Sequence, residues 1–358
     1  MPVVVPVVVP AVVPAVVPVV VPAVVPVVVP TGRAVDAARS ALRAALGDRV
    51  RAAGPDRTEA LAHDTTPLRA PPDIRTIGGA LRVLPVTAPR APHFDGFLDG
   101  IQRSVTIAYL DGVPLLHGTA AAAIRERDRE GRLHTWRTPL VDHAVYTSRA
   151  MLGDAMWARV ADILDTRGHA LRDSDDAMPV VSRHPSALLR QGLDALSQAR
   201  SDLERSVGES WCDAHGERPL YVDGSLRGSR AMLRSTGVAG VVKSHATLYV
   251  PDAQLAMVLG LGAGERTSLV AVMDDGERRR HLTWYLRLRS AAGRDPFFGL
   301  VRVETGAAEA DDAALEAAAD RVSCGLLAER SPLARPDARW DVMPYAIRDC
   351  EVYLRAVA

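Results

Sequence analysis

The chain has 358 residues, of which 48% are apolar and 24% charged, as expected for a packed globular protein of one or two domains. Basic and acidic residues number 43 each, which argues against a protein that coats a polyanion but leaves room for a local basic groove. The three cysteines (Cys212, Cys324 and Cys350) include no CxxC pair, which argues against disulfides and cysteine-bound zinc and fits a reducing cytoplasm.

The first 92 residues precede the predicted core. In residues 1–30 a proline recurs every fourth position, with only valine and alanine between. Prolines at this spacing rule out a membrane-spanning helix, and no secretory signal pattern is present. We expect either an extended, polyproline-like arm or a start codon assigned too early in a GC-rich repeat. The lead-in over 31–92 is expected to hold a helix over 34–53 and a short strand near 80–86.

A β-hairpin is predicted to open the core. Asp111-Gly112 separates two apolar runs, Val105–Leu110 and Val113–His117. Both turn residues tolerate a positive φ, which the tight two-residue hairpin turn requires. The sequence therefore predicts two or three antiparallel strands at this point.

Beyond the hairpin, helices and strands are mixed. Residues 120–184 are rich in arginine and are expected to form an inserted subdomain, and a stripe of leucines predicts a helix over 186–210. The other predicted elements are strands over 219–225, 237–250 (a pair), 282–290 and 298–305, and helices over 308–328 and 341–357. This succession is typical of an α/β domain with a mixed sheet, here spanning residues 93–358.

Two aspartates carry the main chemical signal, since the sequence has no P-loop, GxGxxG, HExxH or GxSxG motif. Asp99 and Asp223 each follow an apolar strand and precede a glycine, which allows a ligand to approach closely. Rigidly held carboxylates of this kind bind hard cations such as Mg²⁺ or Mn²⁺. An isolated Asp-Gly is more often a simple turn, so each aspartate alone has both interpretations.

A third carboxylate is expected on the 186–210 helix. Glu204 lies beside the leucine stripe, four residues after Arg200, and Glu209 is the competing candidate nearer the end of the helix. Glu204 is therefore either a metal ligand or a surface residue paired with Arg200, a contact that stabilises a helix by a few tenths of a kcal/mol.

Lys243 is the only lysine in a chain that has 42 arginines and no asparagine. A compact ammonium at a crowded phosphate or carboxylate site does what a planar guanidinium cannot. The alternative is that a single lysine survived by chance in an arginine-rich composition.

The order of motifs resembles the NurA family of DNA-end-processing nucleases. The resemblance runs from about Phe94 to the C-terminus and rests on seven motifs. These are Asp99-Gly100, Glu204, Asp223-Gly224-Ser225-Leu226, Gly240-Val241-Val242-Lys243-Ser244, Trp284-Tyr285-Leu286-Arg287-Leu288, Arg302-Val303-Glu304 and Met343-Pro344-Tyr345.

The resemblance implies an RNase H-like mixed β-sheet flanked by helices, and a DNA nuclease that depends on Mn²⁺ or Mg²⁺ and has exo- and endonuclease activity. It also implies a cytoplasmic homodimer that works with a HerA-type hexameric ATPase translocase in DNA end processing or repair. Asp99, Glu204 and Asp223 would then hold the metal, and Lys243 would face the scissile phosphate.

The sequence departs from the family pattern near its end. No histidine follows His281, and Cys350 and Glu351 occupy the neighbourhood where the family has a histidine near the metal. Glu351 is the candidate replacement ligand, because carboxylates suit Mg²⁺ and Mn²⁺. His245 is a candidate proton shuttle or substrate contact, or simply a strand histidine facing solvent.

Two arginines are further candidates for binding DNA. Arg287 and Arg302 lie on predicted strands and would line a groove, or else form surface ion pairs with Asp295 and Glu304. Two functional alternatives also stay open: a catalytically silent scaffold that keeps the fold and binds a ring ATPase or DNA, and an RNase H-like enzyme directed at RNA.

Overall fold

The computed structural model describes residues 31–52, 73–87, 93–176, 182–243, 248–273, 279–292, 294, 296–306, 310–330 and 345–358. The proline-rich arm over 1–30 and residues 53–72 and 88–92 of the lead-in lie outside these residues. No helix in the described part of the chain is long and apolar enough to cross a membrane.

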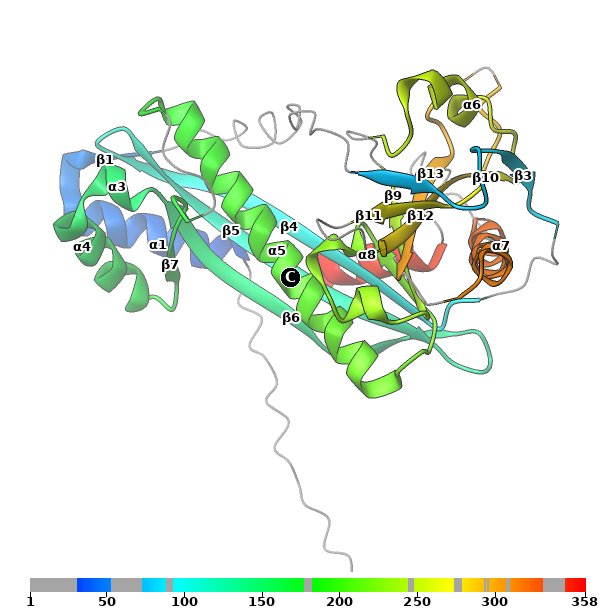
Figure 1. Cartoon of the computed structure of the whole chain (residues 1–358). Coiled ribbons are helices and arrows are strands. Elements are labelled where there is room, and N and C mark those ends of the chain that lie inside the picture. The colour runs from blue at the N-terminus through cyan, green and yellow to red at the C-terminus, as the bar shows by residue number, and fades with distance from the viewer. Residues whose placement is uncertain are drawn as a thin grey trace, which may run out of the picture.

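A large mixed sheet flanked by helices makes the protein an α/β fold, as the sequence predicts at this level (Figure 1). The strands are β1 (Val50–Ala52), β2 (Ile74–Thr76), β3 (Val83–Pro85), β4 (Gly96–Leu110), β5 (Val113–Arg127), β6 (Leu133–Thr147), β7 (Ala170–Asp173), β8 (Leu220–Asp223), β9 (Val238–Val242), β10 (Glu265–Thr267), β11 (Val270–Met273), β12 (Arg279–Arg287) and β13 (Leu300–Gly306). The main helices are α1 (Thr31–Leu46), α3 (Arg149–Leu152), α4 (Asp154–Asp165), α5 (Pro185–His215), α6 (Leu255–Leu259), α7 (Asp312–Glu329) and α8 (Tyr345–Val357).

The strand order is β2-β11-β12-β13-β9-β8-β4-β5-β6-β7. In its centre β4, β8 and β9 run parallel to one another, whereas β5 and β6 continue from β4 as an antiparallel meander. The strands β13, β12 and β11 extend the other side of the sheet in antiparallel pairs.

The predicted hairpin is confirmed. Leu110 pairs with Val113 across the turn, where Asp111 has φ 51° and Gly112 has φ 87°. The strands β4 and β5 are longer than the sequence predicts, with 15 residues each. They pass through the whole molecule, and the N-terminal helix α1 and the helix α4 lie at the end where the turn is (Figure 1).

The predicted helix over 186–210 is also confirmed as α5, which crosses one face of β4, β5 and β6 (Figure 1). It begins at Pro185, where the His184 side chain accepts a hydrogen bond from Ser186 N, and it continues to His215. Gly208 lies inside this helix. A side chain there would collide with Met232, so the glycine allows close packing.

Side chains of β4 alternate between two apolar layers. Phe97 packs with Tyr221 in the layer beneath α7 and α8, whereas Leu98 packs with Val222 and Trp211 beneath α5. Consecutive residues of this strand therefore face opposite helices, and this alternation decides on which side each site residue lies.

Some elements differ from expectation. Within 237–250 the described residues form one strand, β9, and not a pair, and the short strands β2, β10 and β11 were not predicted. The helix α1 ends at Leu46 rather than near residue 53. Residues 120–147 belong to β5 and β6 of the common sheet, while 149–173 supply α3, α4 and β7, so the division into domain and insertion stays a prediction.

Candidate functional site

Two neighbouring parallel strands bring Asp99 and Asp223 together. Leu98 of β4 pairs with Val222 of β8, so the two aspartates are the next residue on each strand and project from the same face. Asp223 ends β8, as predicted, and Gly224 follows with φ 131°. Asp99 does not end a strand, contrary to expectation: it lies inside β4 and pairs with Ala123 of β5.

Lys243 contacts one of these carboxylates directly. It follows β9, whose Val241 pairs with Asp223, so Lys243 is two residues further along on the same face. Its Nζ donates a hydrogen bond to Asp223 Oδ2 over 2.5 Å. Both side chains are largely buried, with 29% of Lys243 and 14% of Asp223 exposed. The only lysine of the chain is therefore part of the predicted site.

Glu204 reaches the site from α5, on the other side of β4. Its side chain lies against Gly100, where an added Cβ would come within 2.7 Å of Glu204 Cγ and 2.8 Å of Cδ. Gly100 therefore serves close packing within a strand, and not a turn. Glu204 Oε1 is buried without a hydrogen-bond partner, and Arg200 Nη1 lies 3.5 Å from it.

The electrostatics of the site show that these groups act on one another. Burial raises the pKa of Asp99 well above its usual range, Asp223 and Glu204 raise it further, and Lys243 opposes them. Burial likewise raises the pKa of Glu204 to about 7; Asp223 adds to this shift and Arg200 works against it. Three carboxylates from three elements thus influence one another electrostatically: Asp99 and Asp223 lie on one face of the sheet, and Glu204 approaches from the face that α5 covers.

The last helix covers this place. Cys350 of α8 is fully buried, and its Sγ donates to the carbonyl oxygen of Ala123 over 3.4 Å, beside Asp99. Burial raises the pKa of this thiol well above its usual range, and the nearby Asp99 adds to the effect. The thiol is therefore held neutral, and it closes the site from the side of α8.

Glu304, which the motif comparison named only as part of Arg-x-Glu, anchors the loop after Asp223. Its carboxylate is fully buried, and Oε2 accepts hydrogen bonds from Ser225 Oγ (2.7 Å) and Leu226 N (3.0 Å). Oε1 accepts from Arg302 Nη2 over 2.8 Å. A glutamate at an inward position of an apolar strand was the available signal for this role.

Other proposed site residues are placed elsewhere. Glu351 uses both carboxylate oxygens in ion pairs, with Arg348 at 2.6 Å and Arg355 at 2.6 Å. Burial opposes the charged form of Glu351, but the two arginines outweigh it and hold its pKa below the usual value. Asp99, in turn, has no electrostatic contribution from Glu351 among its principal neighbours. The structure therefore does not bring Glu351 into the carboxylate group.

The expected DNA-facing arginines are internal. Arg287 is fully buried and donates to four backbone carbonyls, those of Leu259, Leu261, Pro296 and Phe298. Arg302 is 5% exposed, bonds to Glu304 and stacks 4.0 Å over the ring of Tyr249. The groove interpretation was wrong for both, because alternation along a strand cannot tell an exposed arginine from one bonded inside the protein.

Two further candidates have different outcomes. His245 lies outside the described residues, as do Ser244, Asp295 and Met343-Pro344. Glu209, the competitor of Glu204, accepts a hydrogen bond from Ser229 Oγ over 2.7 Å. Glu204 is the helix carboxylate that interacts with Asp99 and Asp223.

The donor set can be tested against a divalent cation. Carboxylates are the ligands that Mg²⁺ and Mn²⁺ prefer. Glu204 Oε1 is buried and has no hydrogen-bond partner, so this oxygen is available to a cation. As placed, however, no three His, Cys, Asp or Glu side chains in the described ranges converge on one metal position. The residues thus fit such an ion by chemistry and require a shift of side chains to hold it.

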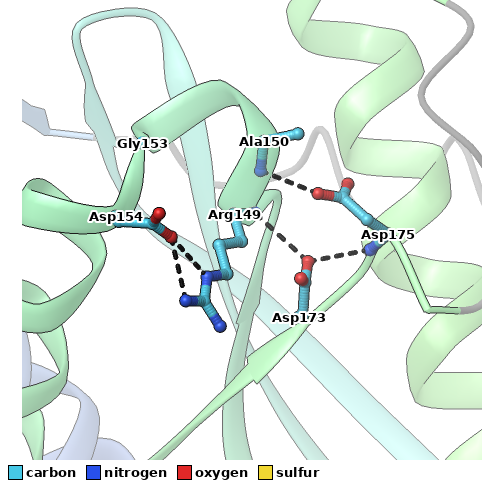
Figure 2. A pocket seen from close by; sticks show the side chains of 6 residues that line it. All are labelled: Arg149, Ala150, Gly153, Asp154, Asp173 and Asp175. Atoms are coloured by element: carbon cyan, nitrogen blue, oxygen red, sulfur yellow. Dashed lines mark hydrogen bonds and ion pairs between the residues drawn. The ribbon is translucent and has the colours of Figure 1, made fainter.

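A separate hollow lies at the other end of the molecule, between α3, the start of α4 and β7 (Figure 2). Asp173 Oδ1 accepts hydrogen bonds from the backbone N–H groups of Arg149 (3.1 Å) and Asp175 (3.0 Å). Asp175 accepts one from Ala150 N over 2.8 Å, and Asp154 pairs with Arg149. These acids hold the start of α3, and none of the predicted site residues lines the hollow.

Comparison with known proteins gives no family assignment. A scan against protein-family models found no match, and a search of curated proteins found none either.

Proposed function

We propose that this chain is a metal-dependent nuclease of the NurA type that hydrolyses DNA phosphodiester bonds. The observation that carries the proposal is the pairing of strands β4 and β8, which puts Asp99 and Asp223 side by side on one face of the sheet, with Glu204 of α5 packed against the next residue, Gly100. These three residues and Lys243 are the ones for which the sequence predicts a role in the site. An α/β fold alone does not define a function, so the proposal rests on this site and on the order of motifs.

The proposed fold is RNase H-like. It is supported by the meander β4-β5-β6, followed by two strands that lie parallel to its first member, with α5 between the meander and the parallel strands. In this arrangement the central strand β4 supplies one aspartate and its parallel neighbour β8 supplies the other.

Each residue of the site has a proposed task. Asp99, Asp223 and Glu204 would hold the cation. Lys243 contacts the phosphate of the strand to be cut, while Glu304 keeps the Asp-Gly-Ser turn in place. A bound Mn²⁺ or Mg²⁺ would supply Lewis acidity, which lowers the pKa of water and neutralises charge on the phosphodiester.

The wider setting belongs to the same proposal: a cytoplasmic homodimer that processes DNA ends together with a HerA-type hexameric translocase. The resemblance of the motifs supports these partners, and no contact within this single chain bears on them.

A catalytically silent scaffold is the second candidate. The observation that favours it is that Asp223 is already neutralised by Lys243, while no three ligands converge in the described residues. Such a protein would keep the fold and bind a ring ATPase or DNA without cutting.

The test is cleavage of end-labelled single- and double-stranded DNA with Mn²⁺, Mg²⁺ or EDTA. Asp223→Ala is compared with wild type and with Asp154→Ala, whose carboxylate is 85% exposed at the distant hollow. We expect cleavage that needs the metal, survives in Asp154→Ala and is lost in Asp223→Ala. Cleavage that persists in folded Asp223→Ala would refute the site, and no cleavage by folded wild type, alone or with a translocase, favours the scaffold.

A further inference from the structure

The cation nearest to the carboxylates is the protein's own. Lys243 Nζ lies 2.5 Å from Asp223 Oδ2, and the paired strands put Asp99 beside Asp223 on the same face of the sheet. One ammonium thus faces two buried acids on the same side of the sheet. Its positive charge therefore lies next to these carboxylates even without a metal ion.

The choice of lysine matters in a chain that uses arginine everywhere else. An arginine can engage both oxygens of a carboxylate, as Arg127 does with Glu329 through Nη1 at 2.6 Å and Nη2 at 2.8 Å. Lys243 bonds through one point to Oδ2 of Asp223. A single-point ammonium on a flexible stem leaves a carboxylate more readily than a planar fork does.

We propose that Lys243 and the divalent cation compete for Asp223. Without metal, Lys243 offsets the repulsion among Asp99, Asp223 and Glu204 and holds Asp223 towards itself. A bound cation would take over that role, and the Lys243 ammonium would then be free to contact the phosphate of the substrate. This inference rests on the proposed nuclease function, and it accounts for carboxylates that interact without converging on one metal position.

The competition predicts that two substitutions of Lys243 change the affinity for Mn²⁺ in opposite directions. Lys243→Met keeps the apolar stem and removes the charge, so the metal no longer has to displace it. Lys243→Arg keeps the charge and adds a fork that can engage both oxygens of Asp223. We therefore expect Mn²⁺ affinity to rise by about tenfold or more in Lys243→Met and to fall below wild type in Lys243→Arg.

The measurement is Mn²⁺ binding, followed by the loss of the electron paramagnetic resonance signal of free Mn²⁺ on titration with protein. Cleavage at saturating Mn²⁺ is measured in parallel and is expected to fall in Lys243→Met although its metal binding is tighter. Circular dichroism checks folding, and Lys243→Gln replaces Lys243→Met if the latter does not fold.

The outcomes separate this inference from the proposed function. If wild type binds Mn²⁺ and cuts DNA while Lys243→Met binds Mn²⁺ no more tightly, the competition is refuted and the nuclease stands. If none of the variants binds Mn²⁺, both proposals fail. Tighter binding in Lys243→Met than in wild type supports the competition, even where wild type binds too weakly to measure.

Discussion

The two ends of the β4–β5 hairpin both bury ionisable groups, but of opposite kinds. Near the start of β4, Asp99 meets Asp223 and Glu204. Near the turn, three histidines from β5, β6 and the residue before β7 cluster instead: His117, His143 and His169. The same pair of strands thus carries an acidic group at one end and an imidazole group at the other.

The three histidine rings lie close to one another. The ring centroids of His117 and His169 are 5.2 Å apart, those of His117 and His143 are 6.4 Å apart, and Thr119 Oγ1 lies 2.9 Å from His143 Nδ1. Burial lowers the pKa of His117 to about 4, and the other two histidines add to this shift. His117 is therefore neutral at pH 7.

The difference teaches which end is organised for a ligand. Buried histidines reach a favourable state at neutral pH simply by losing a proton. Buried carboxylates near one another at pH 7 either bind a proton or need a cation nearby. The single ammonium of Lys243 compensates only part of the charge of these acids. Buried acids whose charge is only partly compensated are typical of functional sites, and in this protein they lie at the acidic end of the hairpin.

The largest expected effect is on DNA cleavage, which distinguishes the acidic end of the hairpin from the histidine end. Asp223→Asn is expected to reduce metal-dependent DNA cleavage by about a thousandfold or more, because it removes a charged ligand. His117→Leu, the matched change at the other end, is expected to leave cleavage within about twofold of wild type. Initial rates on labelled duplex DNA check both, and equal losses in the two variants would remove the distinction between the ends.

Glu304 provides the next test, because it supports the acidic end without belonging to the carboxylate group. Glu304→Gln loses the charged partner of Arg302 and rearranges the bonds to Ser225 and Leu226. We expect about 3 kcal/mol less stability, as for a broken buried ion pair, together with slower cleavage. Urea denaturation measures the loss, and an unchanged midpoint would show that the network does not hold the loop.

Two glycines allow a comparison of packing at the two ends. Alanine at Gly100 meets Glu204, whereas alanine at Gly118 meets Leu196 at 2.7 Å and Tyr146 at 2.9 Å. Both changes are expected to cost about 1–2 kcal/mol through overpacking. Only Gly100→Ala displaces a site carboxylate, so only it is expected to slow cleavage, by about a hundredfold. Similar rates in the two variants would argue against a role for the position of Glu204.

The sequence predicted much of this arrangement, for reasons that lie in local patterns. Asp111-Gly112 specified the hairpin, a leucine stripe specified α5, and an apolar strand with Asp-Gly specified Asp223. Lys243 was singled out because it is the only lysine, and the structure places it on Asp223.

What the sequence could not predict depends on pairing between distant segments. The burial of Arg287 depends on carbonyls from two loops, and the role of Glu304 depends on a loop almost 80 residues earlier. The histidine cluster joins residues 117, 143 and 169, whose spacing follows no motif. Asp99 was placed at a strand end because Asp-Gly usually marks a turn, whereas here the glycine makes room for Glu204.

The smallest expected effect is on how the stability of the protein depends on pH, to which the two ends contribute with opposite slopes. The pKa of Glu204 is raised from 4.5 to about 7, so the folded state binds more protons than the unfolded state between these values. Its contribution to stability is present below pH 4.5 and is lost as the pH rises through about 7. The pKa of His117 is lowered from 6.5 to about 4, so its contribution is present above pH 6.5 and is lost as the pH falls through about 4.

Between pH 4.5 and 6.5 the two contributions therefore have opposite slopes and largely cancel in the metal-free wild type. Glu204→Gln removes its share of the falling slope, to which Asp99 also contributes, and His117→Leu removes its share of the rising one, by up to about 3 kcal/mol each. Urea denaturation in EDTA at several pH values checks this, and parallel curves for the two variants would contradict it. Added Mn²⁺ should sharpen the contrast: it stabilises ionised Glu204 and thus removes the falling slope from wild type, while the histidine end responds to pH as before.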